Sequence, residues 1–594
     1  MAERRFVLTV SILYLAICLF PNLFGLALAG DRFYTGFDLN SDDMCVYMAW
    51  MEQARRGHFL FDNRFTTDEQ PRLTVHAFFF VLGTVSRVTG LYHGTVFHGA
   101  RIVFGLLFLL AAWRLVCRVT KEHRARRIAF GVLLVSAGIG WTMQGMKGVT
   151  GPTDLWQPEG FTFPSLLHNA LFACSLWLMV EAWLAILDAR EQWQPVLRGA
   201  VAMLVLGNIH TYDVLTMALV AIAFASSLAG AKALSPSWGF RSGLVLLGAL
   251  PSVAWLAYVR ASDPVFASRA ATETFSPEPW QFVLGYLPLI LFAAAAVWLR
   301  GREHRPPIVL GFIAAVPLAV LAVLCSAGTP LNRPPEDATG SGMLLGAGPL
   351  ALFFAVFAAL CVGAWAIGRV VGTEGRQRPA LLLMASWASV ALWLPYFPAL
   401  FQRKLTMGAH LPLAILTGIA VAEVLHRLPA RMRGSIAVPA AVLTLLSLSN
   451  LAWLRGSLER ISSDLSSTGI HPVYLSQDQV ATLSWMRTHL PEDATAQDIL
   501  PFACFIPALA GQAVYAGHWS ETPAFVSRIR TVMGELYGGE LQGYRSLSTE
   551  MARELGVQYL LVRKPPPDTY EPDEPPADTE VAFETPSVAL LHVR

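Results

Sequence analysis

The chain has 594 residues, of which 54% are hydrophobic and only 14% are charged. This composition is too apolar for an ordinary soluble protein and is typical of a polytopic membrane protein. The formal net charge of +2 predicts neither a nucleic-acid partner nor an acidic one.

Apolar runs of about 20 residues, the length that a spanning helix needs, recur between residues 6 and 454. The first run, residues 6–30, follows two arginines and is longer than the apolar part of a signal peptide, so we expect it to remain in the protein. Together the runs predict roughly 13 transmembrane helices. Two stretches leave the count open: residues 73–117, and residues 199–230, which are interrupted by the sequence GNIHTYD.

The connections between these runs alternate in charge. By the positive-inside rule, the basic ones are expected in the cytoplasm: residues 117–127, 187–198, 299–307, 368–378 and 426–434. The other connections are richer in proline, tryptophan and acidic residues, and we expect them outside: residues 31–72, 147–165, 261–279, 328–342 and 397–409.

The sequence becomes more polar and more charged after Leu454, and no long apolar run follows. Residues 1–454 are therefore predicted to form the membrane domain, and residues 455–594 a separate soluble domain on the outer side.

This C-terminal part has a mixed pattern that predicts an α/β domain. Residues 478–490 and 523–537 have the spacing of amphipathic helices, the second with Thr522 as N-cap. Strands are predicted for three short apolar runs, residues 512–517, 557–562 and 587–593. Residues 565–580 are rich in proline and acid, so we expect a loop there.

The seven cysteines show no CxxC motif and no metal-ligand spacing, and most lie in apolar runs. Cys45 and Cys504 lie in polar segments and could meet, although two free thiols are the simpler expectation.

The first outer connection contains GFDLNSDDMCVYMAWMEQARRGHF, residues 36–59. Ser41 followed by Asp42 and Asp43 is a good helix start, with the serine as N-cap and the carboxylates near the positive end of the helix dipole. Apolar residues then recur at helical spacing and Gly57 ends the pattern. We expect a short amphipathic helix on the outer membrane surface, and capping alone could explain the two aspartates.

The same two aspartates suit one kind of chemistry at the membrane surface. A carboxylate at the lipid–water boundary can act as general base on a hydroxyl group if the reacting partner is anchored at that depth. A sugar on a polyprenyl phosphate is such a partner. Its leaving group is a stabilised phosphate, so one base and a few cations would suffice, unlike the carboxylate pair of a glycosidase.

A first span, an outer loop that opens with an acidic pair, many further spans and a soluble outer C-terminal domain together resemble the GT-C superfamily of membrane glycosyltransferases. The resemblance covers the whole chain in architecture but only residues 36–76 as a motif. In that superfamily an aspartate of the first outer loop is the catalytic base, and the resemblance carries this role onto Asp42 or Asp43 without choosing between them. It implies a mainly α membrane fold. Because members differ in their need for a divalent metal, no cofactor is certain.

Two further groups are candidate substrate-binding residues. Asp154 and Glu159 lie in an early outer loop, where several GT-C members keep a second acidic residue; a solvated acidic loop is the alternative. The interruption GNIHTYD contains the second group, His210, Tyr212 and Asp213. Ionisable groups within an apolar run often mark a substrate path, and an internally paired kink is the alternative.

Basic residues in the last outer connection are candidates for the donor phosphate. Arg403 and Lys404 precede a span, with His410 at the membrane edge. An arginine with a lysine suits a lipid phosphate, and anchoring to anionic head groups is the alternative.

A loop of the C-terminal part, YAGHWSETP, contains His518, Trp519 and Glu521. Trp519 could stack on a sugar ring, and a packed tryptophan with helix-capping neighbours is the alternative.

The sequence therefore predicts an inverting glycosyltransferase that moves a sugar from a polyprenyl-phosphate carrier to an acceptor at the outer face of a bacterial-type inner membrane. The sugar and the acceptor, whether glycan, lipid or protein, are not identified, and neither is the oligomeric state. A secondary transporter or lipid flippase and an inactive GT-C-like lipid-binding scaffold are the alternatives.

Overall fold

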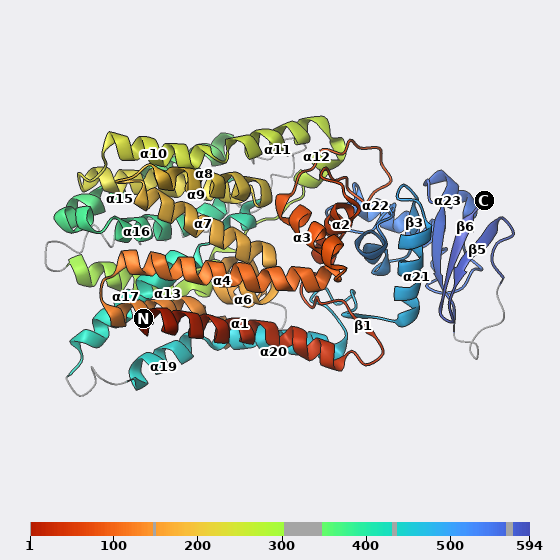
Figure 1. Cartoon of the computed structure of the whole chain (residues 1–594), viewed down its shortest axis with the longest axis horizontal. Helices are drawn as coiled ribbons and strands as arrows, with labels where there is room; N and C mark the ends of the chain where they lie inside the picture. Colours follow the sequence, from red (N-terminus) through yellow and green to blue (C-terminus); the bar gives the residue numbers. More distant parts are fainter. Residues whose placement is uncertain (1, 146–149, 302–346, 430–435, 566–573) are drawn as a thin grey trace. The chain divides into compact units, whose positions relative to one another are not determined.

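The computed structural model describes residues 2–145, 150–301, 347–429, 436–565 and 574–594 (Figure 1). These residues form two compact units. Unit 1 consists of Met1–Leu19, Arg101–Trp255 and Glu273–Arg455, and unit 2 consists of Phe20–Ala100, Leu256–Thr272 and Gly456–Arg594.

Unit 1 is built from helices. Those that lie wholly or partly in it are α1 (Ala2–Leu28), α4 (His93–Val119), α5 (His123–Val135), α6 (Thr162–His168), α7 (Ala170–Asp188), α8 (Gln194–Ile209), α9 (Tyr212–Gly230), α10 (Pro236–Leu247), α11 (Leu250–Ser262), α13 (Pro279–Gly301), α15 (Ala347–Gln377), α16 (Pro379–Ala391), α17 (His410–Arg427), α19 (Ala437–Leu446) and α20 (Leu448–Ser463). Helices far apart in the sequence pack together, as α5 does with α17 and α9 with α15.

Eight helices of the described chain are long and apolar enough to cross a membrane, or up to nine if the bent pair α19 and α20 is one span. The chain is therefore an integral membrane protein with a mainly α fold, as predicted. The predicted count of roughly 13 spans is not confirmed. Residues 302–346, which include most of one predicted cytoplasmic connection and all of one predicted outer connection, lie outside the described residues.

The two stretches that left the count open have different structures. Residues 73–117 contain a short apolar helix, α3 (Ala77–Thr89), and then α4, which is long enough to span. The predicted break in residues 199–230 is confirmed, because α8 ends at Ile209 and α9 begins at Tyr212.

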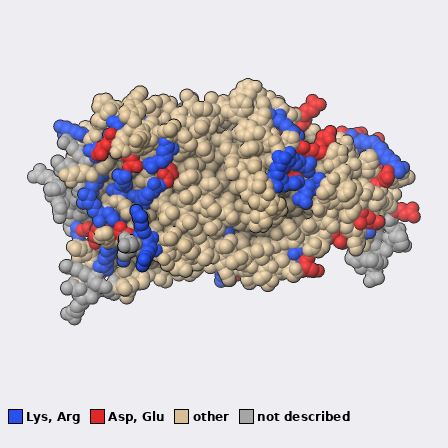
Figure 2. Space-filling model, viewed as in Figure 1, with Lys and Arg blue, Asp and Glu red and all other residues tan. Residues whose placement is uncertain are grey.

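Residues from three predicted cytoplasmic connections lie together at one end of unit 1. Arg118, Arg190 and Arg378 belong to different connections and line the same hollow. Figure 2 shows Lys and Arg side chains gathered at the left of the face in view, beside a wide surface without charged residues. A common location is what the positive-inside rule requires of these connections.

Unit 2 contains a small mixed sheet with the strand order β3-β4-β6-β5. The strands are β3 (Ala496–Gln497), β4 (Tyr559–Arg563), β5 (Thr579–Glu584) and β6 (Val588–Val593). β3 is parallel to β4, whereas β6 is antiparallel to both of its neighbours, with Leu561 opposite Leu590. The sheet carries its own core of buried aliphatic and aromatic side chains, all drawn from between Ile499 and Val593.

The remaining elements of unit 2 join the two ends of the sequence. β1 (Phe33–Tyr34) pairs antiparallel with β2 (Tyr474–Leu475). The helices are α2 (Ser41–Arg56), α3, α12 (Pro264–Ala270), α21 (Gln477–His489), α22 (Phe525–Arg530) and α23 (Thr549–Glu554), with the short helical turns η6 (Phe502–Cys504), η7 (Ile506–Ala510) and η8 (Thr531–Leu536).

The predicted α/β pattern of the C-terminal residues is confirmed in part. Strands β4 and β6 occupy two of the three predicted runs, and α21 the first predicted helix. The third run, residues 512–517, forms no strand, only an isolated bridge at Ala513. Strand β5 begins in the predicted loop 565–580, of which residues 566–573 lie outside the described residues.

The second predicted helix, residues 523–537, starts later than its sequence suggests. α22 begins at Phe525 because Ala524 has a positive φ of 50°, so Thr522 is not its N-cap. The Thr522 hydroxyl instead donates to the Phe65 carbonyl at 2.7 Å.

α2 has the predicted length but a different environment. It begins at Ser41 and ends at Gly57, whose φ of 105° suits glycine, but the N-cap position is Asn40 rather than Ser41. Most of the helix is buried on all sides, against α3 and η7. A Cβ at Gly83 of α3 would lie 2.3 Å from the Met51 carbonyl, so the two helices touch at backbone distance. The prediction of an amphipathic surface helix is therefore wrong.

Candidate functional site

The aspartate pair occupies the first turn of α2 in unit 2 and faces one histidine. His518 Nε2 lies 3.5 Å from Asp43 Oδ1 and 4.0 Å from Asp42 Oδ2. The His518 side chain is fully buried, whereas the side chains of Asp42 and Asp43 are 11% and 34% exposed. Asp43 is thus the aspartate that a reacting molecule reaches more readily.

The loop around His518 fixes the proton that points at the aspartates. The backbone N–H groups of Ser520 and Glu521 point at His518 Nδ1 at 3.2 and 3.3 Å, so in the neutral ring this nitrogen is the acceptor and Nε2 carries the proton. Burial lowers the pKa of His518, but the neighbouring Asp43 carboxylate outweighs burial and raises it to about 9. At neutral pH the Nε2 proton is therefore present and available to the carboxylates.

Further charged groups surround this pair. Glu521 is buried, and burial raises the pKa of its carboxyl group. Its Oε1 forms an ion pair with Arg269 Nε at 2.6 Å. The Arg269 guanidinium lies 4.7 Å from the centre of the Trp50 ring. Three carboxylates thus share two cationic groups, all within unit 2.

Trp519 follows His518 and stacks on it, with ring centroids 6.0 Å apart. Its side chain is 44% exposed, so one part of the indole is free to contact another molecule. An exposed indole is the geometry that stacking on a sugar needs.

The predicted phosphate-binding residues belong to unit 1. Arg403 lies in the short helix η5 (Gln402–Thr406), and its Nε is 3.1 Å from Oε1 of the buried Glu159. The structure therefore joins two residues that were predicted for different roles. Lys404 follows Arg403 in the same short helix and is half-buried.

His410 begins α17 and is buried. Both of its ring nitrogens are engaged, Nε2 with the Ser136 hydroxyl and Nδ1 with the Thr162 hydroxyl, each at 2.9 Å. His410 thereby links the start of α17 to the segments that carry Ser136 and Thr162 within unit 1.

Asp154 and Glu159 are buried, so the alternative of a solvated acidic loop is wrong for both. Asp154 Oδ2 accepts from the Gly140 backbone N–H at 3.0 Å and from the Ser449 hydroxyl at 2.6 Å. Burial raises the pKa of Asp154 to about 6.

The residues at the break between α8 and α9 interact with one another. His210 Nδ1 lies 3.0 Å from Asp213 Oδ2, and the Tyr212 ring packs 5.0 Å from that of Phe401. This is the internally paired kink that the sequence offered as an alternative.

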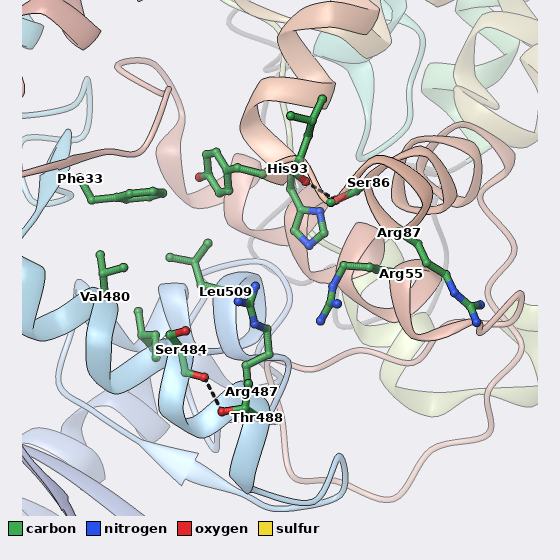
Figure 3. Close-up of a pocket in the computed structure, with 14 residues that line it drawn as sticks. Phe33, Arg55, Ser86, Arg87, His93, Val480, Ser484, Arg487, Thr488 and Leu509 are labelled. Carbon is green, nitrogen blue, oxygen red and sulfur yellow. Dashed lines mark hydrogen bonds between the residues drawn. The ribbon is translucent and has the colours of Figure 1, made fainter.

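Unit 2 also contains a cavity of 580 Å³ that neither aspartate lines (Figure 3). Arg55, His93 and Arg487 lie around it, and Phe33, Val480 and Leu509 form an apolar side. Arg55 is held by two hydrogen bonds to Glu52, each 2.6 Å long. Arg487 has no acidic partner among the described residues. The lining combines cationic and apolar groups, which suits an anionic group attached to an apolar one.

Among the described residues, no three His, Cys, Asp or Glu side chains are grouped so that they could hold a metal ion.

The sequence predicts His518 as a loop residue and does not connect it with the aspartates. Arg269 was not predicted as part of the site. The signal for Arg269 was weak: a single arginine in an outer connection. The contact of His518 with α2 joins opposite ends of the sequence, and no local pattern reports it.

The chain matches no family model and no curated protein. Among solved structures, the oligosaccharyltransferase of Archaeoglobus fulgidus in its apo form matches with a TM-score of 0.46 and 15% identity, over 95% of this chain and 70% of that one. The same archaeal enzyme, AglB, in complex with an inhibitory peptide and a dolichol-phosphate matches with a TM-score of 0.44 and 14% identity, over 94% and 70% of the two chains.

ArnT from Cupriavidus metallidurans, bound to undecaprenyl phosphate, matches with a TM-score of 0.42 and 13% identity, over 98% of this chain and 97% of that one. These likenesses concern the arrangement of the chain and not its chemistry.

Proposed function

We propose that the chain is a membrane glycosyltransferase that transfers a sugar from a polyprenyl-phosphate carrier to an acceptor hydroxyl, with inversion, at the extracytoplasmic face of a bacterial-type inner membrane. The observation that carries the proposal is the aspartate pair at the start of α2, which faces the proton of a buried histidine while Asp43 stays partly exposed. A pair that served only as a helix cap would need no such partner.

In the proposed reaction Asp43 or Asp42 takes the proton of the acceptor hydroxyl. At the same time the oxygen of that hydroxyl bonds to the anomeric carbon of the sugar. The bond from that carbon to the phosphate oxygen breaks, and the polyprenyl phosphate leaves with the electron pair. A weak base suffices, because the leaving group is already a stable anion. Both aspartates lie at the positive end of the helix dipole and face the His518 proton.

Arg403 is the proposed ligand of the donor phosphate. Its guanidinium now pairs with Glu159, and a lipid phosphate would compete for the same N–H groups. Replacing Glu159 by glutamine removes this competitor and should tighten binding of polyprenyl phosphate several-fold, whereas Arg403→Met should weaken it. The matched control is the surface pair Arg427 and Glu423, whose substitutions should leave binding unchanged.

The decisive experiment uses the full chain in proteoliposomes with a panel of short-chain polyprenyl-phosphate sugars. Release of polyprenyl phosphate and glycosylation of acceptor are followed by mass spectrometry. The double variant Asp42→Asn/Asp43→Asn should lose turnover by about 100-fold to 10,000-fold, the usual contribution of a general base. Asp31→Asn, at an exposed position of the same outer connection, is the matched control and should keep full turnover.

Full turnover in a correctly folded double variant would reject the aspartates as the base. Binding of polyprenyl phosphate without turnover of any donor in the panel would favour the lipid-binding scaffold. Movement of the intact lipid between leaflets would favour a flippase.

A further inference from the structure

Two cysteines from opposite ends of the sequence meet inside unit 2. Cys45 lies in α2, two residues after Asp43, and Cys504 ends the short helix η6. Both side chains are buried and both thiols are free in the structure, and each thiol shifts the pKa of the other, so the two side chains lie close together. The elements that carry them, α2 and η6, pack together.

The groups around Cys504 link this pair to the loop of His518. Cys504 Sγ donates to the Gly517 carbonyl at 2.7 Å, and Gly517 directly precedes His518. His471 Nε2 lies 3.4 Å from the same sulfur, and its Nδ1 is 2.9 Å from the Thr468 hydroxyl. The thiol pair therefore lies between the helix that carries the aspartates and the loop that carries their histidine.

The other described cysteines have a different setting. Cys18, Cys117, Cys174 and Cys361 lie on helices that qualify as membrane spans. Among the described cysteines, Cys45 and Cys504 are the pair that belongs to polar, non-spanning segments, and they lie on two elements that pack together.

We propose that Cys45 and Cys504 form a disulfide bond that locks α2 against the C-terminal segment. The inference rests on the proposed function in one respect, the extracytoplasmic location of unit 2, where disulfides persist. The oxidant would be an external disulfide of the dithiol–disulfide exchange class. One thiolate attacks it and forms a mixed disulfide, and the second thiolate displaces the external group, so that two protons and two electrons leave the pair.

Because both sulfurs are buried in the folded unit, the exchange takes place while α2 is still docking. The finished bond would then fix the start of α2 beside the loop of residues 517–522. The distance between the aspartates and His518 Nε2 would depend on it, so reduction should loosen the geometry on which the proposed base relies.

The test detects the disulfide bond directly. The full chain is purified from cells with an oxidising extracytoplasmic compartment, its free thiols are alkylated with N-ethylmaleimide under denaturing conditions, and it is digested without reductant. Mass spectrometry should find the peptides of Cys45 and Cys504 joined, two hydrogens lighter than their sum, and separated by reductant. Complete alkylation of both peptides before reduction would overturn the proposal.

Two sets of variants make the assignment specific. Cys45→Ser and Cys504→Ser should each abolish the linked peptide, whereas the matched control Cys361→Ser should leave it in place. Reductant should lower the thermal unfolding midpoint of the wild type but not that of Cys45→Ala/Cys504→Ala. An equal effect of reductant on both would count against a structural role for the bond.

The result is distinguishable from a failure of the proposed function, because the linkage is measured without any sugar turnover. A linked peptide in a chain that turns over no donor would reject the glycosyltransferase and keep the disulfide. Donor turnover in a chain whose two thiols are fully alkylated would reject the disulfide and keep the glycosyltransferase.

Discussion

His518 faces both aspartates of α2 with its Nε2 proton, because two backbone N–H groups occupy Nδ1. A histidine in this position points its proton at the carboxylates and does not touch a substrate itself. It is therefore a positioning residue in the proposed reaction. Asp154 differs from the two aspartates of α2, because its carboxyl group is buried in unit 1. Burial disfavours its ionised form and raises its pKa.

Replacing His518 should change the pH dependence of the proposed reaction. The change His518→Leu removes the donor that faces the carboxylates and also a group whose pKa is about 9, so the alkaline fall in kcat/KM that deprotonation of His518 causes should be absent from the variant. The conservative change His518→Gln keeps an N–H donor that does not titrate, so it should keep more activity than His518→Leu and should also lack the alkaline fall. His489→Gln, on an exposed histidine, is the control. An unchanged profile in His518→Leu would mean that the residue only packs.

Asp154 should make the protein less stable as the pH rises. Its folded-state pKa of about 6 lies above the ordinary carboxyl value, so its contribution to stability is fully present below that ordinary value and is lost as the pH rises through 6. Asp154→Asn stays neutral. As the pH rises from 5 to 7, the thermal unfolding midpoint of this variant in detergent should increase relative to that of the wild type. The midpoint of the exposed control Glu69→Gln should change with pH as that of the wild type does. A gap that does not change with pH would contradict this account.

At the scale of elements, the buried carboxylate of Glu52 organises the C-terminal half of α2. Arg55 donates to it twice at 2.6 Å, Arg56 Nε donates at 3.0 Å, and His93 Nε2 at the start of α4 lies 2.9 Å away. Burial acts to raise the pKa of Glu52, but the bonds from Arg55 and His93 outweigh it and lower the pKa to about 2. A buried and fully bonded acid explains why α2 tolerates charge on a face that does not contact water.

Glu52→Gln should destabilise unit 2 by about 3 kcal/mol at neutral pH, because it removes the buried counter-charge that Arg55, Arg56 and His93 share. The wild-type advantage should persist above the ordinary carboxyl pKa and disappear as the pH falls toward 2. Chemical or thermal unfolding in detergent measures both effects.

The matched control is Glu492→Gln, which breaks a similar cluster with Arg64, Arg72 and His58 at a site where the carboxylate is 28% exposed. Solvent screens this cluster, so the loss should stay below about 1 kcal/mol. Equal losses at the two sites would show that burial is not what makes the Glu52 cluster matter.

At the scale of the whole molecule, unit 2 is assembled from both ends of the chain. The sheet has a core of its own between Ile499 and Val593, whereas η6 and η7 pack against α2 from the first outer connection. We therefore expect the residues after 455 to contain one part that is stable alone and one part that needs the N-terminal segment.

Hydrogen exchange should separate these two parts. In an isolated fragment of residues 456–594, strands β4 and β6 should keep their protection, while residues 502–510 should exchange at least about tenfold faster than in the full chain. Mass spectrometry of both samples measures this. Equal protection of residues 502–510 in the fragment would show that the C-terminal residues fold as one independent domain.

The sequence alone determined the features that depend on local chemistry. The length of apolar runs identified a membrane protein, the polar interruption located the break between α8 and α9, and Gly57 fixed the end of α2. Short apolar runs placed β4 and β6. Each of these is set by neighbouring residues along the chain, so a linear pattern carries it.

Only the tertiary structure decided which side chains meet. The burial of most of α2, the pairing of Arg403 with Glu159, the approach of His518 to the aspartates and the packing of η6, which carries Cys504, on α2 join segments that are distant in the sequence. Such contacts are selected by the packing of whole elements, because burial leaves each polar group dependent on whichever partner the fold brings near.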